Sequence, residues 1–280
     1  MNNLPSCVQA GIGTVNPSYS VVGLYSDFGD DKLTNLAVSN IAQLTNIVPQ
    51  NIEIIVVLND PTDKLIGALK KFDRLIVLTT NKNLGCVVKN IGYQIAQGDY
   101  IFSIDHDVFV KNSYAFTKCI DFLNNNPNSA LVGPCGGNIV DKYWTQTSWG
   151  VGEQDNKKHI FGYDDPVDFG INESVDGTPV DTIPSMFWCF RRKLLQEIGY
   201  LDWRFGPFVG SDTDFCFRIK EKGHSVNVIR VPMNHIGGGA CSHRKQSFLK
   251  LVLENHLKEL YDKWFSKKNI ICEYYKNEIT

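Results

Sequence analysis

The chain has 280 residues, of which 43% are hydrophobic and 21% are charged, and its formal net charge is -2. This length allows one large domain or two small ones, and the composition is that of an ordinary soluble globular protein. The nearly neutral charge gives no argument for nucleic-acid binding.

No apolar run approaches the roughly 20 residues that span a bilayer, and the polar residues 1–20 lack the basic and apolar regions of a signal peptide. The eight cysteines are spread along the chain without a Cys-x-x-Cys pair. This spacing favours buried, reduced thiols over a disulfide framework or a zinc site. We therefore expect a cytoplasmic protein.

The first half of the chain alternates short apolar runs with segments whose apolar residues recur at helical spacing. The runs predict buried strands, and the spacing predicts helices. We expect strands at 20–25, 52–58 and 75–78, a strand within 100–110, and helices at 33–47, 65–69 and 87–96, the last with a C-cap at Gly98. This order predicts an α/β fold with a Rossmann-like, mostly parallel sheet and helices on both faces.

The second half is less regular. Residues 138–184 show no clear period, and irregular spans of that length are usually functional or mobile. We expect helices at 113–125, 191–198 (closed by Gly199), after residue 211 and at 247–264, strands at 131–133, 186–190 and 225–231, and a loop at 234–239.

Polar residues follow the strands of the first half. In a parallel sheet, ligands bind outside the carboxyl ends of the strands. Five candidate binding residues fall there, namely Asp27, Asn59, Asp60, Asn83 and Asp105.

Asp105 and Asp107 lie in the run YIFSIDHDVFV at 100–110. Positions i and i+2 of a strand point the same way, so both carboxylates face one pocket if the extended geometry continues through them. Two such charges repel unless a cation lies between them or one is protonated, and oxygen ligands suit Mg²⁺ or Mn²⁺. Alternatively, one aspartate caps the next helix and the other is a solvated loop residue. The hypothesis is a divalent metal site that holds a phosphorylated ligand.

A series of motifs follows the chain. It consists of an Asn and Asp turn at 59–63, Asn-x-Gly segments at 83–85 and 90–92, Asp-x-Asp at 105–107, Leu-Asp-x-x-Phe at 201–205, an acidic helix start at 211–214 with Arg218, His-x-x-Gly at 235–238 and Lys263-Trp264. In this order the motifs resemble the family 2 glycosyltransferases, which have the GT-A fold and use nucleotide sugars. The resemblance spans residues 20–264.

The resemblance implies one GT-A domain at 20–265. Its nucleotide-binding half is 20–110 and its acceptor and catalytic half is 111–245. An N-terminal extension at 1–19 and a C-terminal tail at 266–280 would flank this domain.

The resemblance also implies roles for single residues. Nucleotide-sugar binding is expected of Asn59, Asp60, Asn83, Gly85, Asp105 and Asp214. Asp105, Asp107 and His235 are expected to hold Mn²⁺ or Mg²⁺, with Asp107 as the direct ligand and Asp105 nearer the ribose or joined to the metal through water. For His235, a hydrogen-bonded loop histidine is the alternative, and His106 is expected to be structural.

Asp212 matches the catalytic position of the family and would act as the base that takes the proton of the acceptor hydroxyl. A carboxylate at the start of a helix is also an ordinary N-cap, so Asp212 and Asp214 could exchange these roles. Arg218 is expected to pair with one of the two carboxylates.

Three segments are candidates for contacts with larger partners. The aromatic span 144–163 is a candidate acceptor region, with core packing as the alternative. The basic residues 243–245 could contact the diphosphate or be solvated. The tail at 263–275 could rest on an anionic membrane that holds lipid-linked acceptors, with a solvated terminal helix as the alternative.

The predicted function is transfer of a sugar from a nucleotide-diphosphate donor, expected to be UDP-linked, to a hydroxyl of a glycan or lipid-linked acceptor, with metal dependence and inversion. This would be a step of polysaccharide biosynthesis in the cytoplasm or at the inner face of the membrane. One alternative is a phosphatase of the haloacid-dehalogenase type, in which Asp105 would be a nucleophile. The other is a non-catalytic module that binds nucleotide sugars.

Overall fold

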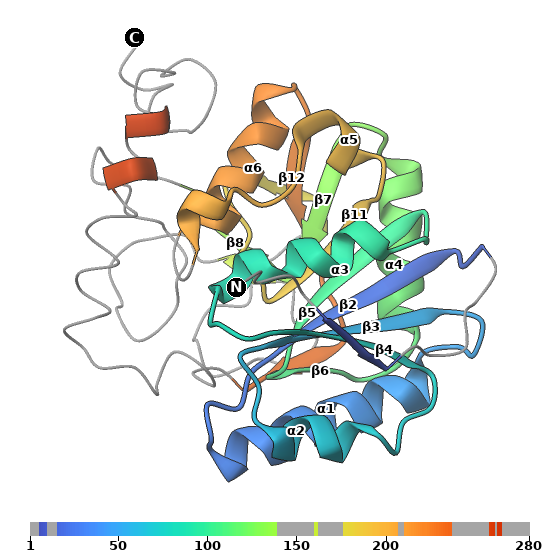
Figure 1. Cartoon of the computed structure of the whole chain (residues 1–280). Coiled ribbons are helices and arrows are strands. Elements are labelled where there is room, and N and C mark those ends of the chain that lie inside the picture. The colour runs from blue at the N-terminus through green and yellow to red at the C-terminus, as the bar shows by residue number, and fades with distance from the viewer. Residues whose placement is uncertain are drawn as a thin grey trace, which may run out of the picture.

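The computed structural model describes residues 6–9, 16–138, 160–161, 176–206, 210–236, 258–260 and 262–264. A nine-stranded sheet with the order β1-β4-β3-β2-β5-β11-β7-β12-β10 runs through the molecule (Figure 1). Its strands are β1 (Ser6–Gln9), β2 (Tyr19–Tyr25), β3 (Glu53–Asn59), β4 (Leu75–Thr80), β5 (Tyr100–Asp105), β7 (Ser129–Gly133), β10 (Thr178–Val180), β11 (Phe187–Arg191) and β12 (Ser225–Val228).

The strands β4, β3, β2 and β5 are parallel to one another, and β12 is parallel to β7. Between these groups lies β11, which is antiparallel to both of its neighbours, β5 and β7. The edge strands β1 and β10 are also antiparallel. The predicted α/β fold with a mostly parallel sheet is therefore confirmed, and residues 6–9 of the expected N-terminal extension add an edge strand.

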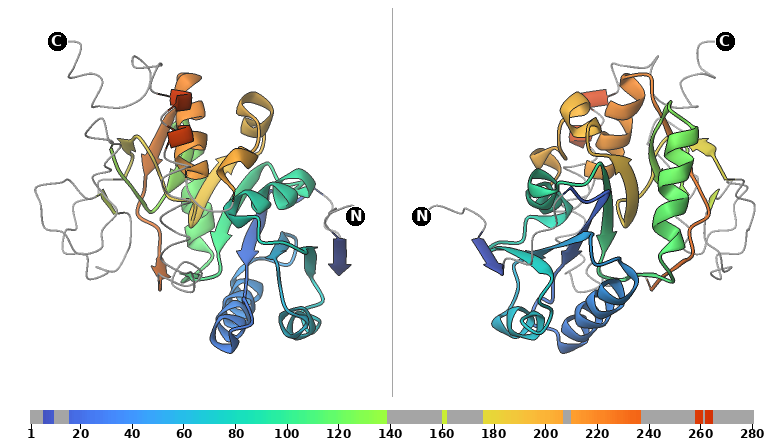
Figure 2. Two further views of the ribbon diagram at one scale, coloured as in Figure 1. Left: turned by 60° about the vertical axis from the view of Figure 1, so that its left-hand side comes forward. Right: turned by 90° about the vertical axis from the view of Figure 1, so that its right-hand side faces the viewer.

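Helices lie on both sides of this sheet (Figure 2). They are α1 (Asp31–Ile47), α2 (Asp63–Leu69), α3 (Lys89–Ile95), α4 (Tyr114–Asn125), α5 (Leu194–Ile198) and α6 (Ser211–Glu221), with 3-10 turns η1 (Gly85–Val88) and η2 (Trp203–Phe205). Two short ribbons complete the fold, β6 (Val108–Val110) with β13 (Met233–His235) and β8 (Cys135–Gly136) with β9 (Ile160–Phe161).

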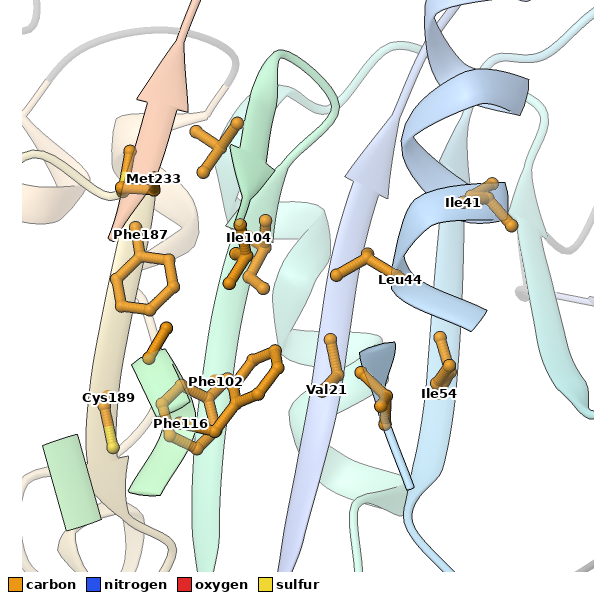
Figure 3. Packing of buried hydrophobic residues seen from close by; sticks show 14 of the residues in the cluster. Val21, Ile41, Leu44, Ile54, Phe102, Ile104, Phe116, Phe187, Cys189 and Met233 are labelled. Carbon is orange, nitrogen blue, oxygen red and sulfur yellow. The ribbon is translucent and has the colours of Figure 1, made fainter. Parts of the chain in front are cut away.

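Each face of the sheet has its own hydrophobic core. Val21 packs on one side with residues of α1, α2 and α4, whereas Val22 packs on the other with residues of α3, α5 and α6. Successive strand residues point to opposite faces, so a continuous apolar run supplies both cores. On the first face, the rings of Phe102 and Phe116 meet edge to face at 4.9 Å (Figure 3).

The helix predicted at 87–96 differs from expectation at both ends. It begins as the 3-10 turn η1, and α3 ends at Ile95 rather than at Gly98. Gly98 is needed for close packing instead, because a Cβ there would lie 2.3 Å from the backbone of Tyr19. The buried Glu53 carboxylate closes this turn by accepting hydrogen bonds from the N–H groups of Gln97 (2.6 Å) and Gly98 (3.3 Å). By contrast, Gly199 closes α5 with a φ of 79°, as predicted.

Several predictions fall on residues that the structure does not describe. These are Trp144, Trp149 and Tyr163 of the candidate acceptor region, the side chain of Phe161, the basic residues 243–245, and most of the spans 138–184, 247–264 and 265–280. Among the described residues, no helix combines the length and apolar character that a membrane crossing requires.

Candidate active site

The loops that follow β2, β3 and β4 are joined by short polar side chains. Asp27, which is fully buried, accepts hydrogen bonds from the hydroxyl of Thr34 (3.1 Å) and from both the N–H (3.1 Å) and the hydroxyl of Thr62. Thr62 is the N-cap of α2. Asp27 therefore holds the starts of α1 and α2 together, which is a structural role.

Asn59 and Asn83 form one hydrogen-bonded unit at the ends of β3 and β4. The side chain of Asn59 accepts from the N–H of Leu84 (2.8 Å) and donates to Oδ1 of Asn83 (2.9 Å), which also accepts from the N–H of Gly85 (3.0 Å). Gly85 has a φ of 68°, which a glycine adopts without strain. The unit shapes the loop that leads into η1.

Asp60 differs from these neighbours because it is exposed and has a φ of 56°, an uncommon value for a residue with a side chain. The structure thus brings Asn59, Asn83 and Gly85 together and leaves Asp60 at the surface. Contact of these four residues with a nucleotide sugar stays a prediction.

Asp105 is the last residue of β5, and its N–H donates to the carbonyl of Met186 (2.9 Å). Its Oδ1 lies 2.7 Å from Nζ of Lys89, which is fully buried and also donates to the carbonyl of Ser185 (2.6 Å). About a third of the Asp105 side chain remains exposed (32%). One oxygen of Asp105 is therefore taken up by a protein cation, while part of the carboxylate faces outward.

Sequence reasoning missed Lys89. Its signal is a lysine directly after the apolar residues Val87 and Val88, at the start of a helix whose first turn is buried. A second missed contact joins the same loop to α6, because the sulfur of Cys86 lies 2.8 Å from the hydroxyl oxygen of Ser211. Burial, together with the nearby Asp212, raises the pKa of Cys86 to about 11, so this cysteine is a neutral thiol at pH 7.

Asp107, directly before β6, lies close to His235 of β13. The extended geometry of β5 ends at Asp105, so Asp107 lies in a turn before β6, and His235 belongs to β13 rather than to a loop. Its Nε2 is 3.5 Å from Oδ2 of Asp107, and the carbonyl of Asp107 accepts from the N–H of Ile236 (3.0 Å). The sequence allows the strand of Asp105 to continue through Asp107, but in the structure it ends at Asp105. Asp107 is positioned instead by the ribbon of β6 and β13.

Burial acts to raise the pKa of Asp107, but a hydrogen bond from His235 and the positive potential of His235 and His106 lower it further than burial raises it. Asp107 is therefore a carboxylate at neutral pH. A carboxylate oxygen with an imidazole nitrogen is a donor set that suits Mn²⁺.

The described residues contain no group of three or more His, Cys, Asp or Glu side chains that would hold a metal ion alone. A divalent cation bound by Asp107 and His235 would take its remaining ligands from water and from diphosphate oxygens, as Mg²⁺ does in nucleotide sites. The residues present fit such a cation.

Asp212 lies in the first turn of α6. The N-cap of this helix is Gly210, which has a φ of 96° and no capping side chain, so neither Asp212 nor Asp214 is the N-cap. The carboxylate of Asp212 accepts a hydrogen bond from the N–H of Thr213 (2.9 Å) and lies near the backbone of Ser185. Burial raises the pKa of Asp212, against the lowering effect of these nearby backbone groups and of Lys89.

Ser185 therefore connects the two halves of the site. Its carbonyl accepts from Lys89, which pairs with Asp105, and its backbone lies near the carboxylate of Asp212. The candidate base and the candidate donor-binding aspartate therefore both lie near one buried cation, Lys89. The motifs at 105–107 and 211–214, far apart in the sequence, are thus brought together.

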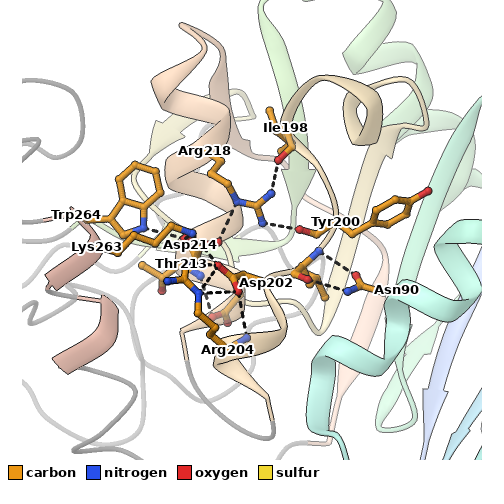
Figure 4. A network of polar contacts seen from close by, with 12 residues as sticks. Asn90, Ile198, Tyr200, Asp202, Arg204, Thr213, Asp214, Arg218, Lys263 and Trp264 are labelled. Carbon is orange, nitrogen blue, oxygen red and sulfur yellow. Dashed lines mark hydrogen bonds and ion pairs between the residues drawn. The ribbon is translucent and has the colours of Figure 1, made fainter. Parts of the chain in front are cut away.

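Asp214 is fully buried, and both of its oxygens meet protein donors (Figure 4). Oδ2 accepts from Nε of Arg218 (2.9 Å), as expected for that arginine, while Oδ1 meets the indole N–H of Trp264 (2.9 Å) and Nζ of Lys263 (2.6 Å). These contacts favour an anchoring role for Asp214, and its contact with the nucleotide sugar stays a prediction. Trp264 belongs to the segment 263–275, for which the sequence predicts a membrane contact or a solvated helix. Its side chain is buried against the protein instead.

The fold is the GT-A fold. The sequence model described as "Glycosyl transferase family 2" matches residues 35–199, more than half of the chain. The chain belongs to this family. The match includes the Asp-x-Asp motif and ends before Asp212 and His235. Because the matching family consists of glycosyltransferases, the phosphatase alternative receives no support. Among curated proteins, no sequence relative matches the chain.

Two solved structures share the fold. GalNAc-T7 with UDP, GalNAc and Mn²⁺ is similar with a TM-score of 0.60 and 12% identity, over 87% of this chain and 50% of that one. The mannosyltransferase PcManGT from Pyrobaculum calidifontis, in complex with GDP-Man and Mn²⁺, has a TM-score of 0.51 and 16% identity, over 91% of this chain and 72% of that one. The chain thus spans about half of the GalNAc-T7 structure.

Proposed function

We propose that the protein transfers a sugar from a nucleotide-diphosphate donor, UDP-linked, to a hydroxyl of a glycan or lipid-linked acceptor, with a divalent cation and with inversion. The observation that carries this proposal is the connection of Asp105 to Asp212 through Lys89 and Ser185. This connection supports the proposal, because the candidate donor-binding carboxylate of Asp105 and the candidate base Asp212, whose pKa is raised, both lie near one buried lysine. The Mn²⁺ in both structural neighbours supports the choice of cation.

In this proposal, Asp107 and His235 would hold the cation, which would supply positive charge to the departing diphosphate. Asp212 takes the proton of the acceptor hydroxyl as its oxygen attacks the anomeric carbon. The bond from that carbon to the diphosphate breaks, and the nucleoside diphosphate leaves. Attack from the face opposite the leaving group inverts the configuration.

The exposed part of the Asp105 carboxylate is directed to the donor, on the ribose side. Its buried oxygen remains with Lys89, so this carboxylate keeps its orientation when a donor binds. A cytoplasmic location, a lipid-linked acceptor and a role in polysaccharide biosynthesis stay predictions from the sequence.

Two measurements test the proposal. In a thermal-shift screen, nucleoside diphosphates and their sugars should raise the melting temperature more with Mn²⁺ than without it, because ligands that bind the folded state stabilise it. With the donor found in this way, release of the nucleoside diphosphate should depend on an added saccharide acceptor. Metal-dependent binding without release of product from any acceptor or from water would instead indicate the non-catalytic module.

A further inference from the structure

Lys263 contacts both ends of one segment of the site. Its Nζ lies 3.0 Å from Oδ2 of Asp202 and 2.6 Å from Oδ1 of Asp214 (Figure 4). Between these two aspartates the chain passes through η2 and enters α6, where it presents Asp212. A single ammonium group from the C-terminal part of the chain therefore joins the two ends of the segment that carries the candidate base.

The lysine is itself held by its surroundings. Its ammonium lies 5.6 Å from the ring centre of Phe205 and 5.5 Å from that of Trp264. Trp264 is buried, donates its indole N–H to Asp214 and meets the ring of Phe217 edge to face at 5.5 Å. Cation and aromatic faces attract each other at such distances. Lys263 and Trp264 thus form a packed contact with α6, which we call the C-terminal contact.

The charges around this contact favour a fixed geometry. Hydrogen bonds from Arg204 and then from Lys263 hold the pKa of Asp202 well below its usual range, so Asp202 is ionised at neutral pH. Asp214 pairs with Arg218 on its other oxygen. Two carboxylates that reach the same ammonium lie close enough to repel each other without it. Lys263 removes that repulsion.

The C-terminal contact is made with the first turn of α6, which carries the candidate base Asp212. Asp214 is two residues beyond Asp212, in the same helical turn, and the helix begins at Gly210 without a capping side chain. A Cβ built at Gly210 would lie 3.7 Å from Leu260, so the C-terminal segment also packs against the start of the helix. With no cap of its own, the first turn of α6 depends on these contacts for its position.

We propose that Lys263 is a positioning residue for the transfer reaction: by holding Asp202 and Asp214 together, it fixes the turn of α6 from which Asp212 reaches the acceptor hydroxyl. Lys263 acts through Asp214 and touches neither the donor nor the acceptor. The inference rests on the proposed function, because it assigns a task to Lys263 in that reaction.

Three variants test this inference. Lys263→Met keeps the length and much of the apolar contact but removes the charge, and Lys263→Arg restores the charge. Lys258→Met makes the same change at an exposed lysine of the same segment and is the matched control. For each variant, kcat, the KM for the donor and the melting temperature are measured with the full chain.

We expect Lys263→Met to lower kcat roughly 10- to 100-fold, since a displacement of about 1 Å in a catalytic group has an effect of that size. The KM for the donor should not change, because Asp214, through which Lys263 acts, is fully buried and both of its oxygens already meet protein donors. Lys263→Arg should recover most of the lost kcat, and Lys258→Met should behave as the parent protein.

A Lys263→Met protein that melts earlier but keeps the parent kcat at a temperature where it is folded would overturn the inference, as would equal losses in Lys258→Met. Should Lys263→Met fail to fold, Trp264→Phe takes its place, because it keeps the ring and removes only the N–H that Asp214 accepts. Parent kcat in that variant would then overturn the inference. If the parent protein itself transfers no sugar, the proposed function fails, and the role of Lys263 falls with it.

Discussion

Nζ of Lys89 lies 2.7 Å from Oδ1 of Asp105, although the lysine side chain has no exposed surface. A buried ammonium is stable only when it is paired and hydrogen-bonded, and Lys89 meets both conditions through Asp105 and the carbonyl of Ser185. The ion pair of Lys89 and Asp105 is therefore expected to stabilise the fold as well as to orient Asp105 in the candidate site.

Lys89→Met should lower the free energy of unfolding by about 3–5 kcal/mol, because it leaves the Asp105 carboxylate without its partner. Urea denaturation measures the change. The same substitution at Lys82, an exposed residue of the preceding loop, should stay within about 0.5 kcal/mol of the parent protein. Equal effects of the two substitutions would contradict a structural need for the ion pair.

Asp107→Asn should remove the metal dependence of nucleotide binding. An amide oxygen is a weaker ligand for a divalent cation than a carboxylate, because it carries no negative charge. We expect the affinity for UDP in the presence of Mn²⁺ to fall roughly 10- to 100-fold, to the value measured without metal. Titration calorimetry gives both affinities.

Asp99→Asn is the matched control for that experiment, since it makes the same change at an exposed residue just before β5, at the opposite end from Asp105. Its affinity for UDP should equal that of the parent protein with and without Mn²⁺. If Asp107→Asn also keeps the parent affinities, the metal site lies elsewhere.

Asp212→Asn should lower sugar transfer at saturating donor by roughly 10²–10⁴, the range that general-base catalysis supplies. The asparagine side chain keeps an oxygen for the N–H of Thr213, so the local structure and donor binding should survive. The quantities to compare are kcat and the separately measured donor affinity. Near-normal turnover in this variant would exclude Asp212 as the base.

Asp214→Asn should lower the stability of the fold more than it lowers turnover. Arg218 and Lys263 would each lose the carboxylate charge that they share, and breaking such a buried set of ion pairs costs about 3–5 kcal/mol. Thermal melting shows this loss, and kcat of the folded fraction should fall less than in Asp212→Asn. A larger loss of kcat at unchanged melting temperature would mean that the two aspartates exchange roles.

The raised pKa of Asp212 predicts a pH dependence. Only the ionised carboxylate can accept a proton, so kcat should rise with pH through a pKa above the ordinary value of about 3.9 for aspartate. The folded state also binds this proton more tightly than the unfolded state does. The free energy of unfolding should therefore lose a contribution as pH rises from about 3.9 through the folded pKa.

The residual activity of Asp212→Asn provides the control for the pH profile. It should lack the rising limb, because the variant has no titrating carboxyl at this position, and its unfolding free energy should change less over the same pH window. A rising limb that persists unchanged would assign the titration to another group.

Much of the first half of the fold was predictable from the sequence, because its signals are local. Each of the strands β2, β3 and β4 is a short apolar run within a few residues of its predicted bounds, and α1 follows from the spacing of Leu33, Ala37, Ile41 and Leu44. In the structure, side-chain caps begin both α1 and α2. Asp30 caps α1 and Thr62 caps α2, each through its side-chain oxygen.

The reversed direction of β11 and the pairing of β6 with β13 could not be predicted, since their partners are far away in the chain. Phe187 pairs with Ile104 and His235 with Val108, and neither pairing leaves a local pattern. The same holds for the site. Motifs indicated Asp105 and Asp212 separately, but the buried lysine between them is visible only once the chain is folded.

The place of β11 also bears on how the chain reaches its native state during synthesis. One edge of β5 pairs with β2, which is synthesised before it. The other edge pairs with residues Phe187 to Arg191, which are synthesised much later. Until they leave the ribosome, β5 exposes a row of unpaired backbone groups beside an apolar face, and such edges promote aggregation. The contact order of this pairing is high, which slows folding. Chaperone demand should therefore be greatest for nascent chains that end before Arg191.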